Sequence, residues 1–203
     1  DGLAVYVGDN PSGQDNLLKM TDKANPSAMA LSTSAALGLV TQVLDGGLVE
    51  GFSGDDLGIG PLPGPSGTPT ALVGGAALYI SNSGVEAEIA AAWDYLNFLI
   101  SPEIQSRWAS ITGYVPIRGD ALTIEPLASK YADDPRYRVA YDQLVGSGDD
   151  PALRGPILGP QREVRVATAR AVAAIFVGSD VQQALTDAAT EANQLIANYN
   201  ARN

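Results

Sequence analysis

Apolar residues between positions 89 and 100 recur at the spacing of one helical face. The pattern is formed by Ile89, Trp93, Leu96, Leu99 and Ile100. Side chains three or four residues apart share one side of an α-helix, and such a stripe is typical of a helix that packs against a core. We therefore predict an amphipathic helix here, with Trp93 in the core.

A second helix is predicted for residues 104–111. Ser101, Pro102 and Glu103 supply an N-cap, a proline for the first turn and an early acidic residue, and each of them favours a helix start. We expect Trp108 on this helix to pack in the core and not to contact a ligand.

Two features beside these helices suggest the wall of a ligand site. Gly74 and Gly75 open a short apolar strand, where the absence of Cβ atoms lets the backbone approach another group closely. Tyr114 follows Gly113 after the second helix, in a loop where its ring can stack on a ligand. The simpler interpretations are a turn or bulge at the glycines and a tyrosine that covers its own core.

Three further apolar runs predict extended segments. Residues 3–7 form an apolar run with the alternation of a strand. Residues 28–31 predict a short buried strand. Residues 57–63 predict an edge strand, because proline is tolerated only at the edge of a sheet.

A cluster of hydroxyl side chains follows residues 28–31. Ser32, Thr33 and Ser34 precede an apolar run, and one of them is expected to cap a helix there. The alternative is that one hydroxyl faces a ligand at this strand-to-helix junction, where unpaired backbone N–H groups also point outward.

The last part of the chain is predicted to be helical. Residues 125–145 form helical pieces that break at residues 133–135, and residues 163–177 form a helix that Gly178 stops. Asp180 caps the final helix. The apolar faces of the last two helices are expected to be Val166, Ala169, Val172, Ala173 and Phe176 on the first, and Val181, Leu185, Ala188, Ala192, Leu195 and Tyr199 on the second.

Two cations stand at the start of the predicted helix 163–177. Arg162 and Arg165 lie where the helix dipole already places partial positive charge, which is unfavourable unless an anion binds there. A guanidinium and a helix N-terminus directed at one point form a receptor for phosphate or carboxylate. The alternative is that these arginines pair with nearby acidic residues.

The composition removes several classes of function. The 203-residue chain has a formal net charge of −11, which opposes nonspecific binding to nucleic acid or to anionic membrane surfaces. It contains no cysteine and no histidine, so thiol nucleophiles, thiolate or imidazole metal sites and Ser-His-Asp triads are excluded. No apolar run reaches the roughly 20 residues that a membrane-spanning helix needs.

The sequence offers no anchor for a nucleotide enzyme or a serine hydrolase, because phosphate-binding glycine loops and the GxSxG motif are both missing. Asp55 and Asp56 lie in a loop rich in glycine and proline, where we expect solvated turn residues. We therefore expect no enzyme, no metal site and no cofactor. A hydrolase that uses Asp55, Asp56 or Asp94 is the alternative from another class.

Seven short motifs, spread in order over nearly the whole chain, carry a family resemblance. They are Ala28-Met29 to Ser34, Leu62-Pro63-Gly64-Pro65, Gly74-Gly75-Ala76, Ala92-Trp93-Asp94-Tyr95-Leu96, Ser101-Pro102-Glu103, Thr112-Gly113-Tyr114-Val115-Pro116 and Gln183-Ala184-Leu185. In this order they resemble the C-terminal half of family 1 extracellular solute-binding proteins. Within that family the chain is most similar to the glycerol-3-phosphate and glycerophosphodiester binders, which grade into sugar binders.

The resemblance implies an α/β fold of the type II periplasmic-binding-protein class, whose two lobes close on a ligand like a clamshell. Residues 1–72 and 118–203 would belong to the C-terminal lobe, and residues 73–117 to the N-terminal lobe with the hinge crossings. Family members are longer, so we expect the N-terminal half of the protein, with its signal or lipid-anchor segment, to be missing.

The resemblance also implies a ligand-binding set, made of a backbone N–H, a tyrosine for the polar head, an arginine for phosphate and a serine. Thr33 or Ser32 is the alternative to the serine, and Arg162 is the alternative to the arginine. By this resemblance, Gly75 supplies the backbone N–H, Tyr114 is the tyrosine, Arg165 is the arginine and Ser34 is the serine.

The implied function is the solute-binding subunit of an ABC importer, outside the cytoplasmic membrane, that hands a polyol phosphate to permease subunits and is monomeric when complete. This chain alone is expected to bind weakly or not at all, because half a site leaves the ligand hydrated. An oligosaccharide binder of the same family is the alternative. The expected burial of Trp93 and Trp108 argues against it, because sugars need exposed aromatic platforms.

Overall fold

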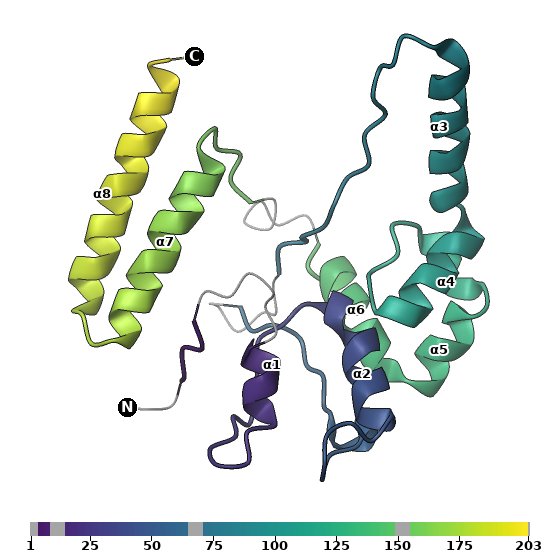
Figure 1. The fold of residues 1–203 in the computed structure, drawn as a ribbon, viewed down its shortest axis with the longest axis horizontal. Helices are drawn as coiled ribbons and strands as arrows, with labels where there is room; N and C mark the ends of the chain where they lie inside the picture. Colours follow the sequence, from purple (N-terminus) through teal and green to yellow (C-terminus); the bar gives the residue numbers. More distant parts are fainter. Residues whose placement is uncertain (1–3, 9–14, 65–70, 149–154, 203) are drawn as a thin grey trace. The chain divides into compact units, whose positions relative to one another are not determined.

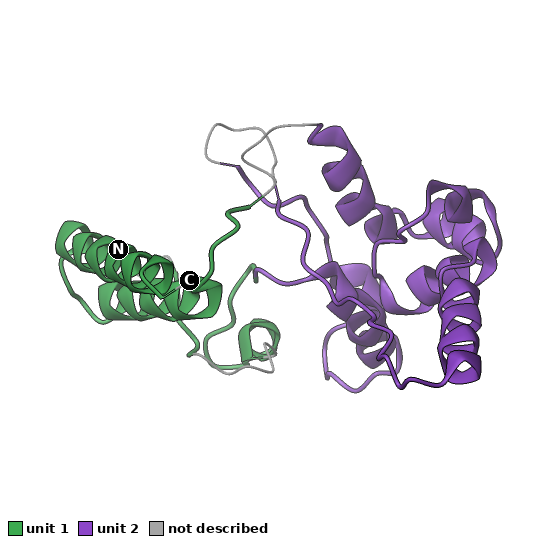
Figure 2. Cartoon of the chain, turned by 90° about the horizontal axis from the view of Figure 1, so that it is seen from above, with its two compact units in different colours: residues 1–30, 155–203 green, residues 31–154 purple. Residues whose placement is uncertain are grey.

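The computed structural model describes residues 4–8, 15–64, 71–148 and 155–202. The chain divides into two compact units, one of residues 31–154 and one of residues 1–30 with 155–203 (Figure 2). Each unit has buried residues of its own. The predicted lobe boundaries, at residues 72 and 118, refer to a two-lobed protein and not to these two units. They stay a prediction.

The described part of unit 31–154 is built from helices (Figure 1). In chain order they are η1 (Ser34–Ala36), α2 (Leu37–Asp45), η2 (Gly54–Asp56), α3 (Glu86–Leu99), α4 (Pro102–Thr112), η3 (Gly119–Thr123), α5 (Leu127–Asp133), η4 (Pro135–Arg138) and α6 (Val139–Gly146). The α4 helix is the centre of this unit, since it packs against α2, α3, η3 and α5.

The core of this unit lies where α2, α4, α5 and η4 meet. Its buried members are Leu37, Ala109, Leu127, Tyr131 and Tyr137, and the partly buried Leu57 and Leu122 pack against them. The Tyr137 hydroxyl lies 2.8 Å from the Thr41 hydroxyl, so the polar end of this buried ring is satisfied.

A buried serine joins α4 to the following elements. The Ser106 side chain is fully buried, and its hydroxyl donates to the Ile124 carbonyl oxygen at 2.8 Å. The same oxygen accepts from the Leu127 N–H at 3.0 Å. One side chain therefore satisfies two backbone groups at the point where α5 starts.

The helix predicted from the apolar stripe at residues 89–100 is confirmed as α3, but its burial is not. No residue of α3 is buried, and Trp93 and Phe98 are 55% and 56% exposed. Trp108 on α4 is also 55% exposed, so the expectation that both tryptophans lie in the core is wrong. The α3 helix packs mainly on α4, which leaves most of its surface uncovered by the described residues.

The predicted strands are not observed among the described residues. Residues 4–8, 28–31, 57–63 and 76–80 are described as extended or irregular chain without a ladder. A strand needs the backbone groups of a neighbour, and the described residues supply no such partner to these segments. Only the helix-rich part of the predicted α/β class is therefore confirmed.

The described helices of the second unit are α1 (Asp15–Met20), α7 (Gln161–Phe176) and α8 (Val181–Asn200). The α7 and α8 helices form a hairpin and lie side by side (Figure 1). Ala167 and Ala171 of α7 are buried in this contact, whereas Val166 and Phe176 are 51% and 45% exposed. The predicted apolar face of α7 is therefore wrong for most of its members, since Ala173 alone among them is half-buried and the other four are exposed.

Several helix limits agree with the sequence signals. The α5 helix ends at Asp133, before Pro135, and the Asp180 carboxylate caps α8 by accepting from the Gln183 N–H at 2.8 Å. Gly178, after α7, has φ 102°. Among the described residues, no helix combines the length and the apolar character that crossing a membrane requires.

Candidate functional site

The start of α2 and the end of α4 meet at two glycines. A Cβ atom on Gly38 would stand 2.0 Å from the Ile111 carbonyl oxygen, and one on Gly113 would stand 2.5 Å from the Ser34 carbonyl oxygen. Only glycine permits backbones to approach so closely. This contact brings Ser34 and the segment before Tyr114, which are far apart in the sequence, to one place.

The hydroxyl side chains of Thr33 and Ser34 have different roles at this junction. Thr33 is the N-cap of η1, and its Oγ1 accepts from the Ala35 N–H at 3.3 Å. Capping is therefore assigned to Thr33. The Ser34 hydroxyl makes no hydrogen bond to the part of the chain that the structure describes, and this half-buried group keeps its capacity to donate and accept hydrogen bonds.

Tyr114 lies on the other side of the junction and is 44% exposed, as its place after a helix predicts. Gly113 ends α4 in the left-handed conformation with φ 84°. The Tyr114 N–H donates to Thr112 Oγ1 at 3.2 Å, and its ring centroid lies 6.1 Å from that of Trp108. The phenol hydroxyl has no hydrogen bond within the described residues and stays available.

Gly75 does not join this junction in the structure. It lies in exposed extended chain, and no atom stands within 4 Å of the position that a Cβ would occupy. Its role as a backbone donor stays a prediction.

Arg162 and Arg165 lie on the first turns of α7, in the other unit. Both side chains are exposed, and neither forms an ion pair with a described residue. The alternative that they pair with nearby acidic residues is thus not observed in the described chain. The helix start also lacks a side-chain cap, since Pro160 occupies the N-cap position. An anion there would satisfy both the guanidinium groups and the first N–H groups.

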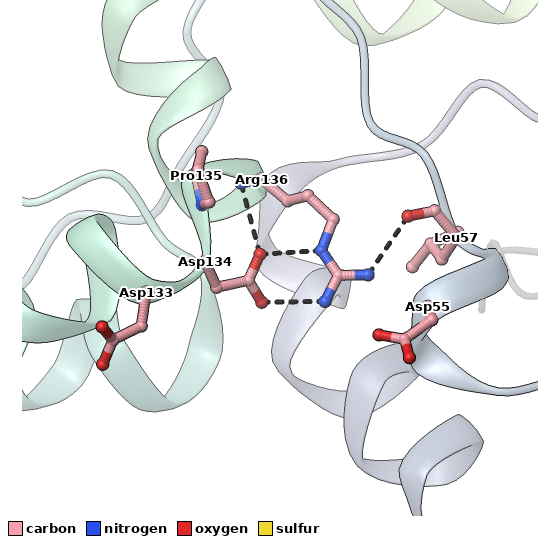
Figure 3. A pocket seen from close by; sticks show the side chains of 6 residues that line it. All are labelled: Asp55, Leu57, Asp133, Asp134, Pro135 and Arg136. Atoms are coloured by element: carbon pink, nitrogen blue, oxygen red, sulfur yellow. Dashed lines mark hydrogen bonds and ion pairs between the residues drawn. The ribbon is translucent and has the colours of Figure 1, made fainter.

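A pocket elsewhere in unit 31–154 holds none of the predicted ligand residues. Its volume is about 380 Å³, and it is lined by Asp55, Leu57, Asp133, Asp134, Pro135 and Arg136 (Figure 3). Arg136 donates to both carboxylate oxygens of Asp134, at 2.7 and 2.9 Å, and to the Leu57 carbonyl oxygen at 3.1 Å. The guanidinium lowers the pKa of Asp134 below its usual 3.8.

Arg136 therefore ties the loop at Leu57 to the start of η4, and we interpret this pocket as structural. The contact between Arg136 and the Leu57 loop was not predicted from the sequence, because the two segments are far apart in the chain. The one local signal was Asp134-Pro135-Arg136, in which an acid and an arginine flank a proline that starts a helix.

The carboxylates of the alternative hydrolase are not brought together as a set. Asp56 accepts from the Ser53 N–H at 2.8 Å and from its hydroxyl at 3.0 Å, and these bonds lower its pKa. Asp55 lines the pocket, and Asp94 lies exposed on α3. Among the residues described, no group of three or more His, Cys, Asp or Glu side chains is placed to hold a metal ion.

Comparison with known proteins gives a family match over most of the chain. The family model described as bacterial extracellular solute-binding protein matches residues 6–138. The match includes the junction of Ser34 and Tyr114 and ends before α7.

Individual relatives are sn-glycerol-3-phosphate-binding periplasmic proteins UgpB. That of Yersinia pseudotuberculosis is 26% identical over 136 residues, which are 65% of this chain and 31% of the relative. An Escherichia coli relative is 28% identical over 130 residues, 64% of this chain and 30% of its own length. That of Salmonella paratyphi A is 25% identical over 177 residues, which are 85% of this chain and 38% of the relative. The chain thus spans about a third of the length of these relatives.

Proposed function

The chain belongs to the bacterial extracellular solute-binding proteins, and from this premise we propose that it is part of the solute-binding subunit of an ABC importer for glycerol 3-phosphate or a glycerophosphodiester. The family supports the binding role, and the relatives, which are glycerol-3-phosphate-binding proteins, support the solute class. The observation that carries the solute class within this chain is the pair of arginines at the start of α7, which form no ion pair with a described residue.

The phosphate contact is assigned to Arg165, with Arg162 as the alternative. A guanidinium presents parallel N–H groups that match two phosphate oxygens, and the free N–H groups of a helix start add to this attraction. A phosphate at this point would also offset the unfavourable placement of two cations in the first turns.

The polyol contacts are assigned to Ser34 and Tyr114, with the Gly75 N–H as a further donor. The two side chains flank one junction, and both hydroxyls lack partners in the described chain. Hydroxyl groups that both donate and accept are suited to the hydroxyls of a glycerol moiety.

We further propose that this chain forms part of a two-lobed type II fold that further polypeptide completes. The α3 helix and the extended residues 71–81 expose large apolar side chains, among them Tyr79 at 89% exposure. Such surface on a folded protein marks contact with another segment. In this proposal residues 73–117 belong to the N-terminal lobe and the hinge crossings, and the complete protein is an extracellular or periplasmic monomer that docks on permease subunits.

The test is isothermal titration of the complete gene product and of this chain with glycerol 3-phosphate, glycerophosphocholine and maltose. We expect Arg165→Ala to weaken binding of the phosphate ligands by about ten- to a hundredfold, because a charge-assisted hydrogen bond contributes roughly 1.5–3 kcal/mol. Arg170→Ala is the matched control, since Arg170 lies on the same helix but pairs with Glu191. Tight maltose binding that Arg165→Ala leaves unchanged would reject the phosphate assignment.

An oligosaccharide ligand is the second candidate, and one observation favours it. Trp93 and Trp108 are exposed, and Trp108 forms an open aromatic pair with Tyr114 beside Ser34. Aromatic faces of this kind stack on sugar rings. Maltose titration of the wild type and of Trp108→Ala distinguishes the two ligand classes. Release of product from a phosphodiester or glycoside would instead establish a hydrolase, and we propose that the protein is not an enzyme.

A further inference from the structure

Trp108 and Tyr114 form an aromatic pair that core packing does not explain. Their ring centroids lie 6.1 Å apart, and their planes are inclined by 54°. At the same time 55% of Trp108 and 44% of Tyr114 stay exposed. Rings at this separation attract each other through their quadrupoles. The contact therefore restricts the motion of two side chains that are both partly exposed to solvent.

The backbone between the two rings is held separately. The Thr112 hydroxyl donates to the Trp108 carbonyl oxygen at 2.7 Å and accepts from the Tyr114 N–H at 3.2 Å. Gly113 packs against the Ser34 carbonyl oxygen and the Leu37 side chain. The main chain of Tyr114 is thus fixed on two sides, and its ring lies against that of Trp108.

We propose that Trp108 is a positioning residue, which holds the Tyr114 ring in one orientation beside Ser34 before a solute arrives. The inference rests on the proposed function in that Tyr114 contacts the solute. Trp108 itself needs no solute contact. A ring that is already oriented loses less conformational freedom on binding, so the complex gains affinity.

The first experiment measures the fluorine resonance of the Tyr114 ring in the absence of any ligand. Labelling this chain with 3-fluorotyrosine gives resonances for its eight tyrosines, and Tyr114→Phe identifies the resonance of Tyr114. We expect Trp108→Leu to shift that resonance, and Trp108→Phe, which keeps a ring, to retain most of the wild-type position. Trp93→Leu is the matched control, because Trp93 is equally exposed at 55%. A Tyr114 resonance that Trp108→Leu leaves in place would overturn the proposal.

The second experiment measures glycerol 3-phosphate affinity of the complete gene product. We expect Trp108→Leu to weaken binding about three- to tenfold, as the strength of an aromatic pair implies, and Trp108→Phe to restore part of the loss. In the Tyr114→Ala background, Trp108→Leu should add little. Additive losses would show that Trp108 contacts the solute directly and would overturn the positioning role. Absence of binding by the wild type would reject the proposed function, and the fluorine resonance alone would then decide the inference.

Discussion

Gly113 is the residue on which the junction of α2 and α4 depends most directly. Its φ of 84° disfavours any side chain, and a Cβ there would lie 2.5 Å from the Ser34 carbonyl oxygen and 2.9 Å from the Leu37 Cβ. We expect Gly113→Ala to lower the free energy of unfolding by roughly 1–3 kcal/mol, measured by urea denaturation.

The control for this prediction is Gly146→Ala at the end of α6. No atom stands within 4 Å of a Cβ at Gly146, and its φ is not positive. Alanine should be neutral there or stabilising by up to about 1 kcal/mol. Equal stability of Gly113→Ala and the wild type would show that the close backbone contact does not exist in solution.

Tyr131 gives the core a dependence on alkaline pH. Burial raises the pKa of Tyr131 to about 12, whereas an unfolded chain loses the phenol proton near pH 10. The folded state therefore binds this proton more tightly, so its contribution to stability is complete below about pH 10 and is lost as pH rises towards 12.

Tyr131→Phe isolates this contribution, since phenylalanine cannot ionise. We expect the stability difference between wild type and variant to change with pH between about 10 and 12, and to be constant from pH 7 to 9. Urea denaturation at each pH measures it. A difference that does not change across the alkaline range would mean that Tyr131 is not buried.

The α7 helix shows how a correct helix prediction can choose the wrong face. Ala171 is 7% exposed against α8, so a larger side chain has no room there. We expect Ala171→Leu to cost roughly 1–3 kcal/mol of stability, because overpacking forces the two helices apart. Thermal or urea unfolding followed by circular dichroism measures the change.

Ala169→Leu is the matched variant on the same helix. Ala169 is exposed, although the sequence pattern placed it in the core, and we expect a change within about 0.5 kcal/mol. If Ala169→Leu were instead the more destabilising variant, the face predicted from the sequence would be the buried one.

The molecule as a whole is expected to unfold in two steps. Units 31–154 and 1–30 with 155–203 have separate buried residues, and both tryptophans lie in the first of them. Tryptophan fluorescence therefore reports one unit, while circular dichroism reports the helices of both. We expect their urea midpoints to differ, which a single cooperative transition does not allow.

Two variants assign the steps. Gly113→Ala should shift the urea midpoint of the fluorescence transition. Ala171→Leu should shift only the dichroism transition of the unit that contains α7, which has no tryptophan. Coincident transitions in the wild type and in both variants would contradict independent units.

Features that depend on near neighbours in the chain could be predicted from the residues alone. Ser101 and Pro102 start α4, Gly113 ends it in a left-handed conformation, and Asp180 caps α8. Caps and turns are decided within a few residues, so local chemistry suffices to predict them. The order of the motifs likewise led to the family that the comparison shows.

Which surfaces meet became visible only in the folded chain. The sequence does not show that Gly38 lets α2 touch the Ile111 carbonyl group, that Arg136 reaches the Leu57 loop, or that α3 stays exposed. An apolar stripe shows which side of a helix can be buried but not whether a partner covers it, and a strand needs a neighbour that its own sequence does not encode. The physical reason is that burial and sheet pairing are properties of two segments, whereas a sequence pattern describes one.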